Sequence, residues 1–297
     1  MKHLIEMLTL GNQDAKAEYV QQHYGKFCKV DDYGNLYLNR NFKKAKPYMV
    51  AHLDTVDEQI TAKQLLYDKT LGMLSAERNG KPCNLGADDG VGIVAALTLF
   101  DSLDVGVALF KDEEVGCIGS TNAEPNYLKN ARFCIQLDRK GNRDCVFESM
   151  GVEIASDDFI KAVEAIAKAF NYSAVSGGMT DVVTLSSEQH VKVSCLNLSC
   201  GYYKPHTTQE YIKLDDMKKA IAFARTIIET HGSTTYPHEA VSLWQDDVGY
   251  LDYYGDDSVR GWLVDLIESQ LSDGEIIEQL QYGITDCQAK VTACTWR

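Results

Sequence analysis

The stretch NLGADDGVGIVAALTLF, residues 84–100, decides how this sequence is read. Two adjacent carboxylates, Asp88 and Asp89, lie between two glycines, and an apolar run of helix length follows directly. This run predicts a buried helix over 90–100, because strands of globular domains are usually shorter. One acid at this position could simply cap the helix. Two adjacent acids between glycines also suggest a functional site.

Short apolar runs on either side of this helix predict strands, and amphipathic patterns predict further helices. The predicted strands cover 47–51, 105–110, 132–137 and 191–198, with a hairpin over 27–39 and helices over 11–25, 156–170 and 213–230. Strands that alternate with helices indicate an α/β fold, here a three-layer sandwich with a mostly parallel central sheet flanked by helices. Ligands of such sheets bind at the C-terminal ends of the strands, so we expect a metal site there.

The chain has 297 residues, enough for one large α/β domain or two small ones. We expect a single catalytic domain over residues 1–231. Residues 232–297 form an acidic, aromatic C-terminal extension, expected to pack on this domain or to serve association. Helical patterns in this extension lie near 257–271 and 274–282.

The charge balance limits the partners. Forty-three acidic and 29 basic residues give a net charge of −14, which repels phosphate backbones and anionic lipids, so we expect neither nucleic acid nor a membrane as partner. No stretch reaches the length of a membrane span, and the start of the chain lacks a signal peptide's pattern. Nine scattered cysteines without a CxxC pair favour reduced thiols. A cytoplasmic protein fits these features, with small molecules, cations and proteins left as partners, and a homo-oligomer is compatible with them.

Side chains that can bind metals or transfer protons follow the predicted strands or precede the predicted helix. They are His52 and Asp54, Asp88 and Asp89, Glu113 and Glu114, Asp138, and His206. So many carboxylates at one edge of a sheet repel each other, so we expect a cation among them. Two imidazoles with three or four carboxylates suit two divalent ions that share one carboxylate, with zinc favoured and manganese or cobalt compatible.

Such a metal pair would hold a water molecule and lower its pKa, and one further carboxylate would have to transfer protons. The neighbours Glu113 and Glu114 can divide this work, one facing the metals and the other the water. Asp54 is two residues beyond His52 and therefore points to the same side of an extended chain, where it could orient the imidazole.

Four strings occur in the order of a known family. AHLDTVD, NLGADDGVGIVAAL, FKDEEVGCIGS and QLDRKG, followed by the histidine of KPHTTQEYI, resemble the motifs of the co-catalytic zinc exopeptidases. This clan holds tripeptidase T-like, aminopeptidase-like and glutamyl-aminopeptidase-like enzymes. The resemblance covers roughly residues 11–230, and four ordered motifs are far more specific than any one of them.

The resemblance implies a role for each matched residue. It places His52 and Asp138 on one metal, Glu114 and His206 on the other, and Asp88 between both. It further implies that Glu113 acts as general base and later as acid, that Asp54 orients His52, and that the peptide bond after Asp88 is cis.

Many relatives of this family carry an inserted lid or dimerisation domain, for which this chain has little room. The two candidate gaps hold 35 residues, 53–87, and 67 residues, 139–205. An inserted domain needs some 50 residues or more, and the second gap already contains a predicted helix and strand. We therefore expect a catalytic domain without a lid.

The expected function is that of a metal-dependent exopeptidase of the aminopeptidase or tripeptidase type, which cleaves a terminal bond of short peptides. One alternative is an N-acyl amino acid amidohydrolase of the same fold, and another is an inactive metal-binding scaffold that recognises a peptide or protein. His190 is a rival to His206 as the last ligand. Asp181, in GGMTDVV, either caps a helix or supports the site.

Overall fold

The structure is a computed structural model in which residues 3–57, 63–188 and 190–242 are described. The chain divides into two compact units, Met1–Trp244 and Gln245–Arg297, and all the described residues belong to the first. The expected helices near 257–271 and 274–282, and the rest of the extension beyond residue 242, lie outside the described residues.

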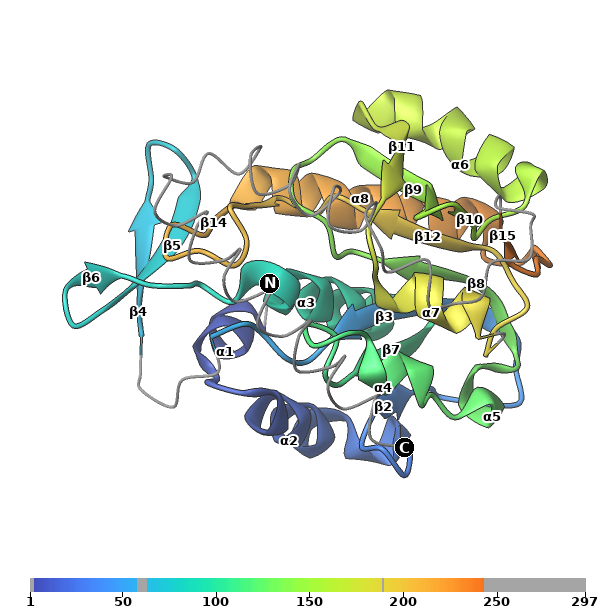
Figure 1. Cartoon of the computed structure of the whole chain (residues 1–297), viewed down its shortest axis with the longest axis horizontal. Coiled ribbons are helices and arrows are strands. Elements are labelled where there is room, and N and C mark those ends of the chain that lie inside the picture. Colours follow the sequence, from blue (N-terminus) through green and yellow to red (C-terminus); the bar gives the residue numbers. More distant parts are fainter. Residues whose placement is uncertain (1–2, 58–62, 189, 243–297) are drawn as a thin grey trace, which may run out of the picture. The chain divides into compact units, whose positions relative to one another are not determined.

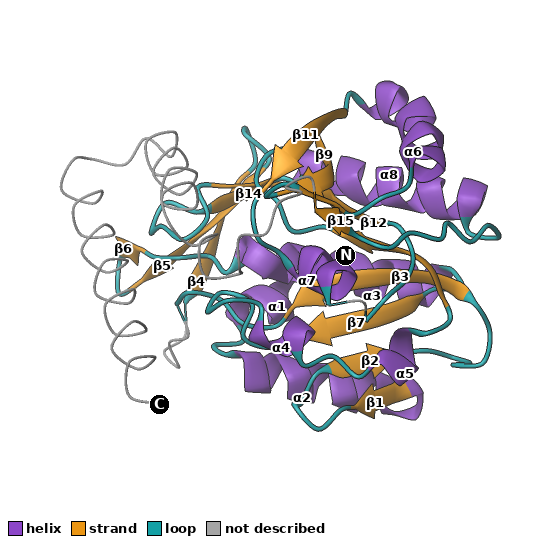
Figure 2. Ribbon diagram, turned by 45° about the vertical axis from the view of Figure 1, so that its right-hand side comes forward, coloured by secondary structure: helices purple, strands orange, loops and turns teal. Residues whose placement is uncertain are grey.

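A ten-stranded sheet runs through this unit in the order β1-β2-β7-β3-β8-β12-β9-β10-β15, with β11 beside β9 (Figure 1). Its strands are β1 (Cys28–Val30), β2 (Leu36–Leu38), β3 (Lys46–His52), β7 (Gly106–Phe110), β8 (Ala131–Gln136), β9 (Asp144–Ser149), β10 (Val152–Glu153), β11 (Ser173–Gly177), β12 (Cys195–Leu198) and β15 (Val241–Ser242). The four central strands β7, β3, β8 and β12 are parallel, whereas antiparallel pairs join them to both ends of the sheet. Figure 2 shows β2, β7 and β3 side by side.

Helices cover both faces of this sheet. They are α1 (Leu4–Thr9), α2 (Gln13–Tyr24), followed by the 3-10 turn Gly25–Phe27, α3 (Ala87–Ser102), α4 (Ile118–Thr121), α5 (Pro125–Leu128), α6 (Asp157–Phe170), α7 (Asp181–Ser187) and α8 (Leu214–His231). The start of α6 is set by Ser156, whose hydroxyl accepts a hydrogen bond from Phe159 N–H, as expected for a cap before two acids. None of the helices among the described residues is both long enough and apolar enough to cross a membrane.

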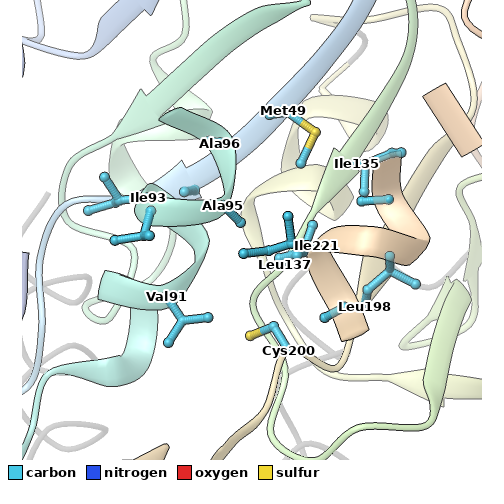
Figure 3. Close-up of a cluster of buried hydrophobic side chains, with 14 of the residues drawn as sticks. Met49, Val91, Ile93, Ala95, Ala96, Ile135, Leu137, Leu198, Cys200 and Ile221 are labelled. Carbon is cyan, nitrogen blue, oxygen red and sulfur yellow. The ribbon is translucent and has the colours of Figure 1, made fainter. Parts of the chain in front are cut away.

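Two apolar cores, one on each face, make this a three-layer structure. Along β3, Met49 and Ala51 belong to the core that contains α1, α3 and α8, whereas Tyr48 and Val50 belong to the core beneath α5 and α7. This alternation is the two-residue period of a strand buried on both faces. Figure 3 shows the first core, in which side chains of the sheet lie between α3 and Ile221 of α8. The predicted fold class, an α/β sandwich with a parallel centre, is confirmed.

A second, smaller sheet was not predicted. It joins β4 (Gln64–Asp68), β5 (Met73–Arg78) and β6 (Lys81–Pro82) with β13 (Tyr202–Tyr203) and β14 (Tyr211–Lys213). The segment 55–83 shows no strand pattern in the sequence, because four of the five side chains of β4 are exposed and no apolar alternation results. The described part of the gap 53–87 thus contains three strands, and the middle one, β5, pairs with β14 from much later in the chain.

The start of the expected extension runs along the larger sheet. The ring of Tyr236 packs against that of Phe159 at a tilt of 56°, with the ring centroids 5.0 Å apart, and its backbone forms hydrogen bonds with Arg132 and Ser194. Within the described residues, the chain after α8 therefore continues the packing of the sheet as far as Ser242.

The close approach of β3 and β7 depends on Gly106. A Cβ atom at this position would lie 2.5 Å from the ring of Tyr48, which is fully buried and is held by hydrogen bonds to Asn39 and Tyr127. We expect Gly106→Ala to lower the free energy of unfolding by about 1–3 kcal/mol, the usual effect of overpacking a core. Urea denaturation measures this change.

Gly25→Ala is the matched control for this substitution. No atom lies within 4 Å of a Cβ built on Gly25, and its φ of −50° suits alanine. We expect this variant to be as stable as the unsubstituted chain or more stable by up to about 1 kcal/mol. Equal stability of the two variants would contradict the packing argument.

Candidate metal centre

His52 ends β3 and is fully buried. Its Nδ1 lies 3.2 Å from Oδ1 of Asp54, and its backbone N–H donates to Asp89. Asp54 also accepts the backbone N–H groups of Glu113 and Glu114, at 3.0 and 2.9 Å. Since β3 and β7 are neighbouring parallel strands, Asp54 joins the segments that follow them and holds the Glu113–Glu114 turn beside the imidazole.

Asp88 lies at the start of α3, directly after a turn in which Gly86 takes a φ of +70°, a conformation that favours glycine. One oxygen of its carboxylate is 3.1 Å from Nε2 of His52 and the other is 3.2 Å from Nε2 of His206. The peptide bond after Asp88 is cis. A single carboxylate therefore lies between two imidazoles, with one oxygen towards each.

The side chains of the two glutamates after β7 lie beside different imidazoles. Oε2 of Glu114 is 3.1 Å from Nε2 of His206, whereas Oε2 of Glu113 is 3.8 Å from Nε2 of His52. The Cys117 thiol donates to the other Glu113 oxygen at 3.6 Å. Both glutamates thus face the imidazoles, each on its own side.

Asp138 follows β8, and its Oδ1 is 3.7 Å from Nε2 of His52. Three donors hold this carboxylate. The Tyr202 hydroxyl donates to Oδ1 at 3.1 Å, and Thr180 and the Gln136 amide donate to Oδ2 at 3.0 and 3.1 Å. These contacts fix the side chain beside His52.

The structure brings together every residue that the sequence analysis proposes as a ligand. Potential ligand atoms lie within 4.8 Å of one another in the sets His52, Asp88, Asp138 and Asp88, Glu114, His206, and also in the set His52, Glu113, Glu114. His190 is not part of these sets, and its Nε2 instead contacts the carbonyl of Thr121. Asp89 points back to backbone N–H groups, including that of Gly92 at the start of α3.

Burial and mutual repulsion govern the charges of the site. Burial raises the pKa values of Glu113, Glu114 and Asp138, and neighbouring carboxylates raise them further. Burial alone would lower the pKa values of His52 and His206, but the surrounding carboxylates outweigh it and raise them well above the ordinary value. The anionic residues thus attract positive charge to this point.

The donor set fits divalent metal ions. Each of the first two sets offers one imidazole and two carboxylates, which are ligands typical of zinc. Among the described residues, Oε1 of Glu114 is buried and has no hydrogen-bond partner, although buried polar atoms rarely lack one. Positive charge at the site would pair with this oxygen and relieve the repulsion among the carboxylates.

Sequence reasoning missed several supporting residues. Tyr202 and Thr180 bond to Asp138, and Glu210 accepts backbone N–H groups at the start of α3. Burial raises the pKa of Glu210 to about 7. Asp181, noted in the sequence, is fully buried, and burial also raises its pKa to about 7. Only the position of Glu210, four residues after His206, could have drawn attention to it.

Searches by sequence find no relative: no protein-family model matches the chain, and no curated protein matches it significantly. Comparison of structures finds peptidases. The aminopeptidase PepT from Bacillus cereus matches with a TM-score of 0.61 and 13% identity, over 77% of this chain and 96% of that chain. A tripeptidase from Staphylococcus aureus matches with a TM-score of 0.60 and 14% identity, over 77% of this chain and 96% of that chain.

The Pyrococcus horikoshii TET1 peptidase, which can assemble into a tetrahedron or a large octahedral shell, matches with a TM-score of 0.51 and 17% identity, over 75% of this chain and 98% of that chain. The chain has the fold of these peptidases. At these identities the likeness concerns the fold, and the chemistry of this chain has to be argued from its own side chains.

The hydrogen bonds of Asp54 predict that it stabilises the Glu113–Glu114 turn. In Asp54→Asn an amide NH2 replaces one accepting oxygen, so one of the buried N–H groups of Glu113 or Glu114 loses its partner. We expect the free energy of unfolding of the metal-free chain to fall by about 1–3 kcal/mol. Urea denaturation in the presence of a chelator measures it.

Asp215→Asn serves as the control, because the Asp215 side chain is 90% exposed and forms an ion pair with Lys218 on the same helix. A surface pair of this kind contributes little, so the change should stay within about 0.5 kcal/mol. If Asp54→Asn is no less stable than this control, Asp54 does not hold the turn.

Proposed function

We propose that the chain is a metal-dependent exopeptidase that hydrolyses a terminal peptide bond of short peptides. The observation that carries this proposal is the position of Asp88, with one oxygen towards His52 and the other towards His206. Each imidazole has its own additional carboxylate, Asp138 or Glu114. Two equivalent half-sites with a shared carboxylate are the arrangement that a pair of metal ions requires.

In this proposal His52 and Asp138 bind one ion, Glu114 and His206 bind the other, and Asp88 binds both. Zinc suits this mixture of imidazoles and carboxylates, and manganese or cobalt is compatible with it. When bound, such an ion pair lowers the pKa of water and polarises a carbonyl oxygen.

Glu113 is the group that transfers protons in this proposal. It takes a proton from the water that attacks the peptide carbonyl carbon and delivers it to the nitrogen of the leaving amine as the C–N bond breaks. Two features support this role: Glu113 lies beside the imidazole of His52, with its Oε2 3.8 Å from Nε2, and burial raises its pKa, which suits a carboxyl group that has to hold a proton during the reaction. Asp54 holds Glu113 through its backbone and orients His52.

The aminopeptidase or tripeptidase type is favoured over other hydrolases by two arguments. The structures that resemble this chain include an aminopeptidase and a tripeptidase. A net charge of −14 also suits a substrate with a free cationic amine. We further propose a homo-oligomer, supported by the assemblies of the TET1 peptidase, and sedimentation velocity of the full chain tests this.

A panel of substrates tests the function itself. The purified chain, loaded with zinc, manganese or cobalt, is assayed on aminoacyl amides, tripeptides and N-acyl amino acids. We expect release of the N-terminal residue from the first two classes and loss of turnover with a chelator. Turnover of N-acyl compounds alone would assign an amidohydrolase instead, and binding of metal without any turnover would leave only a scaffold.

Glu113→Gln separates proton transfer from metal binding. The amide keeps the size of the side chain but cannot accept a proton, so kcat should fall about 100-fold or more. Metal content, measured by mass spectrometry of the elements, should stay near two per chain because Glu113 belongs to neither half-site. Normal turnover in this variant would remove Glu113 from the mechanism.

Asp88→Ala tests the shared carboxylate. Since this residue serves both half-sites, we expect the variant to lose both ions and to bind zinc at least about 10-fold more weakly in titration. The exposed carboxylate Asp215, changed to alanine, provides the control and should keep full occupancy. Two ions per chain in Asp88→Ala would place the bridge elsewhere.

A further inference from the structure

Glu210 is a buried acid that the proposed chemistry does not use. It lies in the connection between β13 and β14 and is 1% exposed. Its Oε2 accepts the backbone N–H of Gly86 at 2.7 Å, and its Oε1 accepts that of Asp88 at 3.2 Å. It belongs to none of the ligand sets among the described residues. Its carboxylate therefore acts on the main chain that carries Asp88.

Lys63 holds the same stretch of main chain from the other side. It directly precedes β4, and its Nζ donates to the carbonyls of Leu85 at 2.8 Å and Asn84 at 3.3 Å. A Cβ atom added to Gly86 would lie 3.3 Å from this Nζ, so the ammonium group packs against the turn itself. Burial lowers the pKa of Lys63, and the attraction of an ionised Glu210 across the segment opposes this effect.

We propose that Glu210 and Lys63 clamp residues 84–88 and thereby position the Asp88 carboxylate for both metal ions. The clamp uses the polarity of the peptide groups: the cation binds two carbonyls and the anion binds two N–H groups of one five-residue segment. Such charge-assisted hydrogen bonds are about twice as strong as neutral ones. Glu210 and Lys63 are positioning residues, since they touch the main chain rather than a ligand atom.

The clamp also connects Asp88 with His206, two proposed ligands of the same ion that come from distant segments of the chain. His206 and Glu210 lie in the same connection between β13 and β14, and Glu210 binds the backbone of Asp88. A shift of the 84–88 segment would therefore move Asp88 away from His52 and His206 together. The smaller sheet, which supplies Lys63, His206 and Glu210, is thus a support of the metal centre.

This inference rests on the proposed metal centre, so its test measures metal binding and not turnover. Zinc is titrated calorimetrically at 25 °C into the metal-free full chain and into Glu210→Gln, Lys63→Met and the double variant. In Glu210→Gln an amide NH2 faces one of the two N–H groups, which loses its acceptor. We expect zinc affinity to fall about 10-fold or more in this variant, and less in Lys63→Met.

A purely structural role would lower the melting temperature and leave the affinity of the folded chain unchanged. We expect the metal-free Glu210→Gln chain to melt only a few degrees lower, so that it is folded during the titration. The double variant should bind zinc more tightly than the sum of the single losses predicts, because both side chains act on the same segment. Gln209→Ala, an exposed neighbour in the same connection, is the control and should bind zinc normally.

Unchanged zinc affinity in Glu210→Gln, or an equal loss in Gln209→Ala, would overturn the inference. If Glu210→Gln does not fold, Lys63→Met, at a half-buried position, decides the matter, and unchanged affinity there has the same meaning. An unsubstituted chain that binds zinc but cleaves no peptide would contradict the proposed function. The clamp would then still be tested by comparing the zinc affinities of the variants with that of the unsubstituted chain. An unsubstituted chain that binds no zinc would overturn both.

Discussion

The carboxylate of Asp88, placed between the imidazoles of His52 and His206, is the interaction on which the arrangement of this protein depends. The two histidines come from different sheets, one from the end of β3 and the other from the connection between β13 and β14. The carboxylate itself comes from the start of α3. Three elements have to be placed correctly before this contact can form, and much of the fold serves that placement.

Concentrated negative charge is the cost of this arrangement. Two unit charges 4 Å apart interact by about 1 kcal/mol in water and by about 4 kcal/mol near a protein surface. Hydrogen-bond donors surround two of these carboxylates. The backbone N–H groups of Glu113 and Glu114 donate to Asp54, and the side chains of Tyr202, Thr180 and Gln136 donate to Asp138. These bonds orient Asp54 and Asp138, whereas burial, together with the neighbouring carboxylates, raises the pKa values of Glu113, Glu114 and Asp138.

The sequence predicts which side chains gather at the edge of the larger sheet better than it predicts the smaller sheet beside them. His52, Glu114 and Asp138 lie at or just beyond the ends of parallel strands, and such ends meet at one edge of a sheet. His206 was noted because it follows the predicted strand over 191–198, and the family resemblance supplied its role as a ligand; in the structure it follows a two-residue strand of the smaller sheet. The smaller sheet was not predicted because the side chains of β4 are mostly exposed, so its sequence lacks the apolar alternation that marks a strand. Glu210 escaped because its partners are backbone groups 122 and 124 positions away, and no pattern in the chain marks such contacts.

The proposed ligands all lie at or just beyond the ends of strands, or at the first turn of a helix, and this placement has a consequence for how the chain can diverge. The interior of each element has to be apolar and to fit its neighbours, and many residues satisfy that demand. Only a few positions at the ends are tied to particular atoms. Chains that differ at most positions can therefore share this architecture, as the comparison with the aminopeptidase PepT illustrates, with 13% identity at a TM-score of 0.61. Among chains with this fold, similarity of sequence is therefore expected mainly in the short strings that carry these positions, and much less in the interiors of the helices and strands.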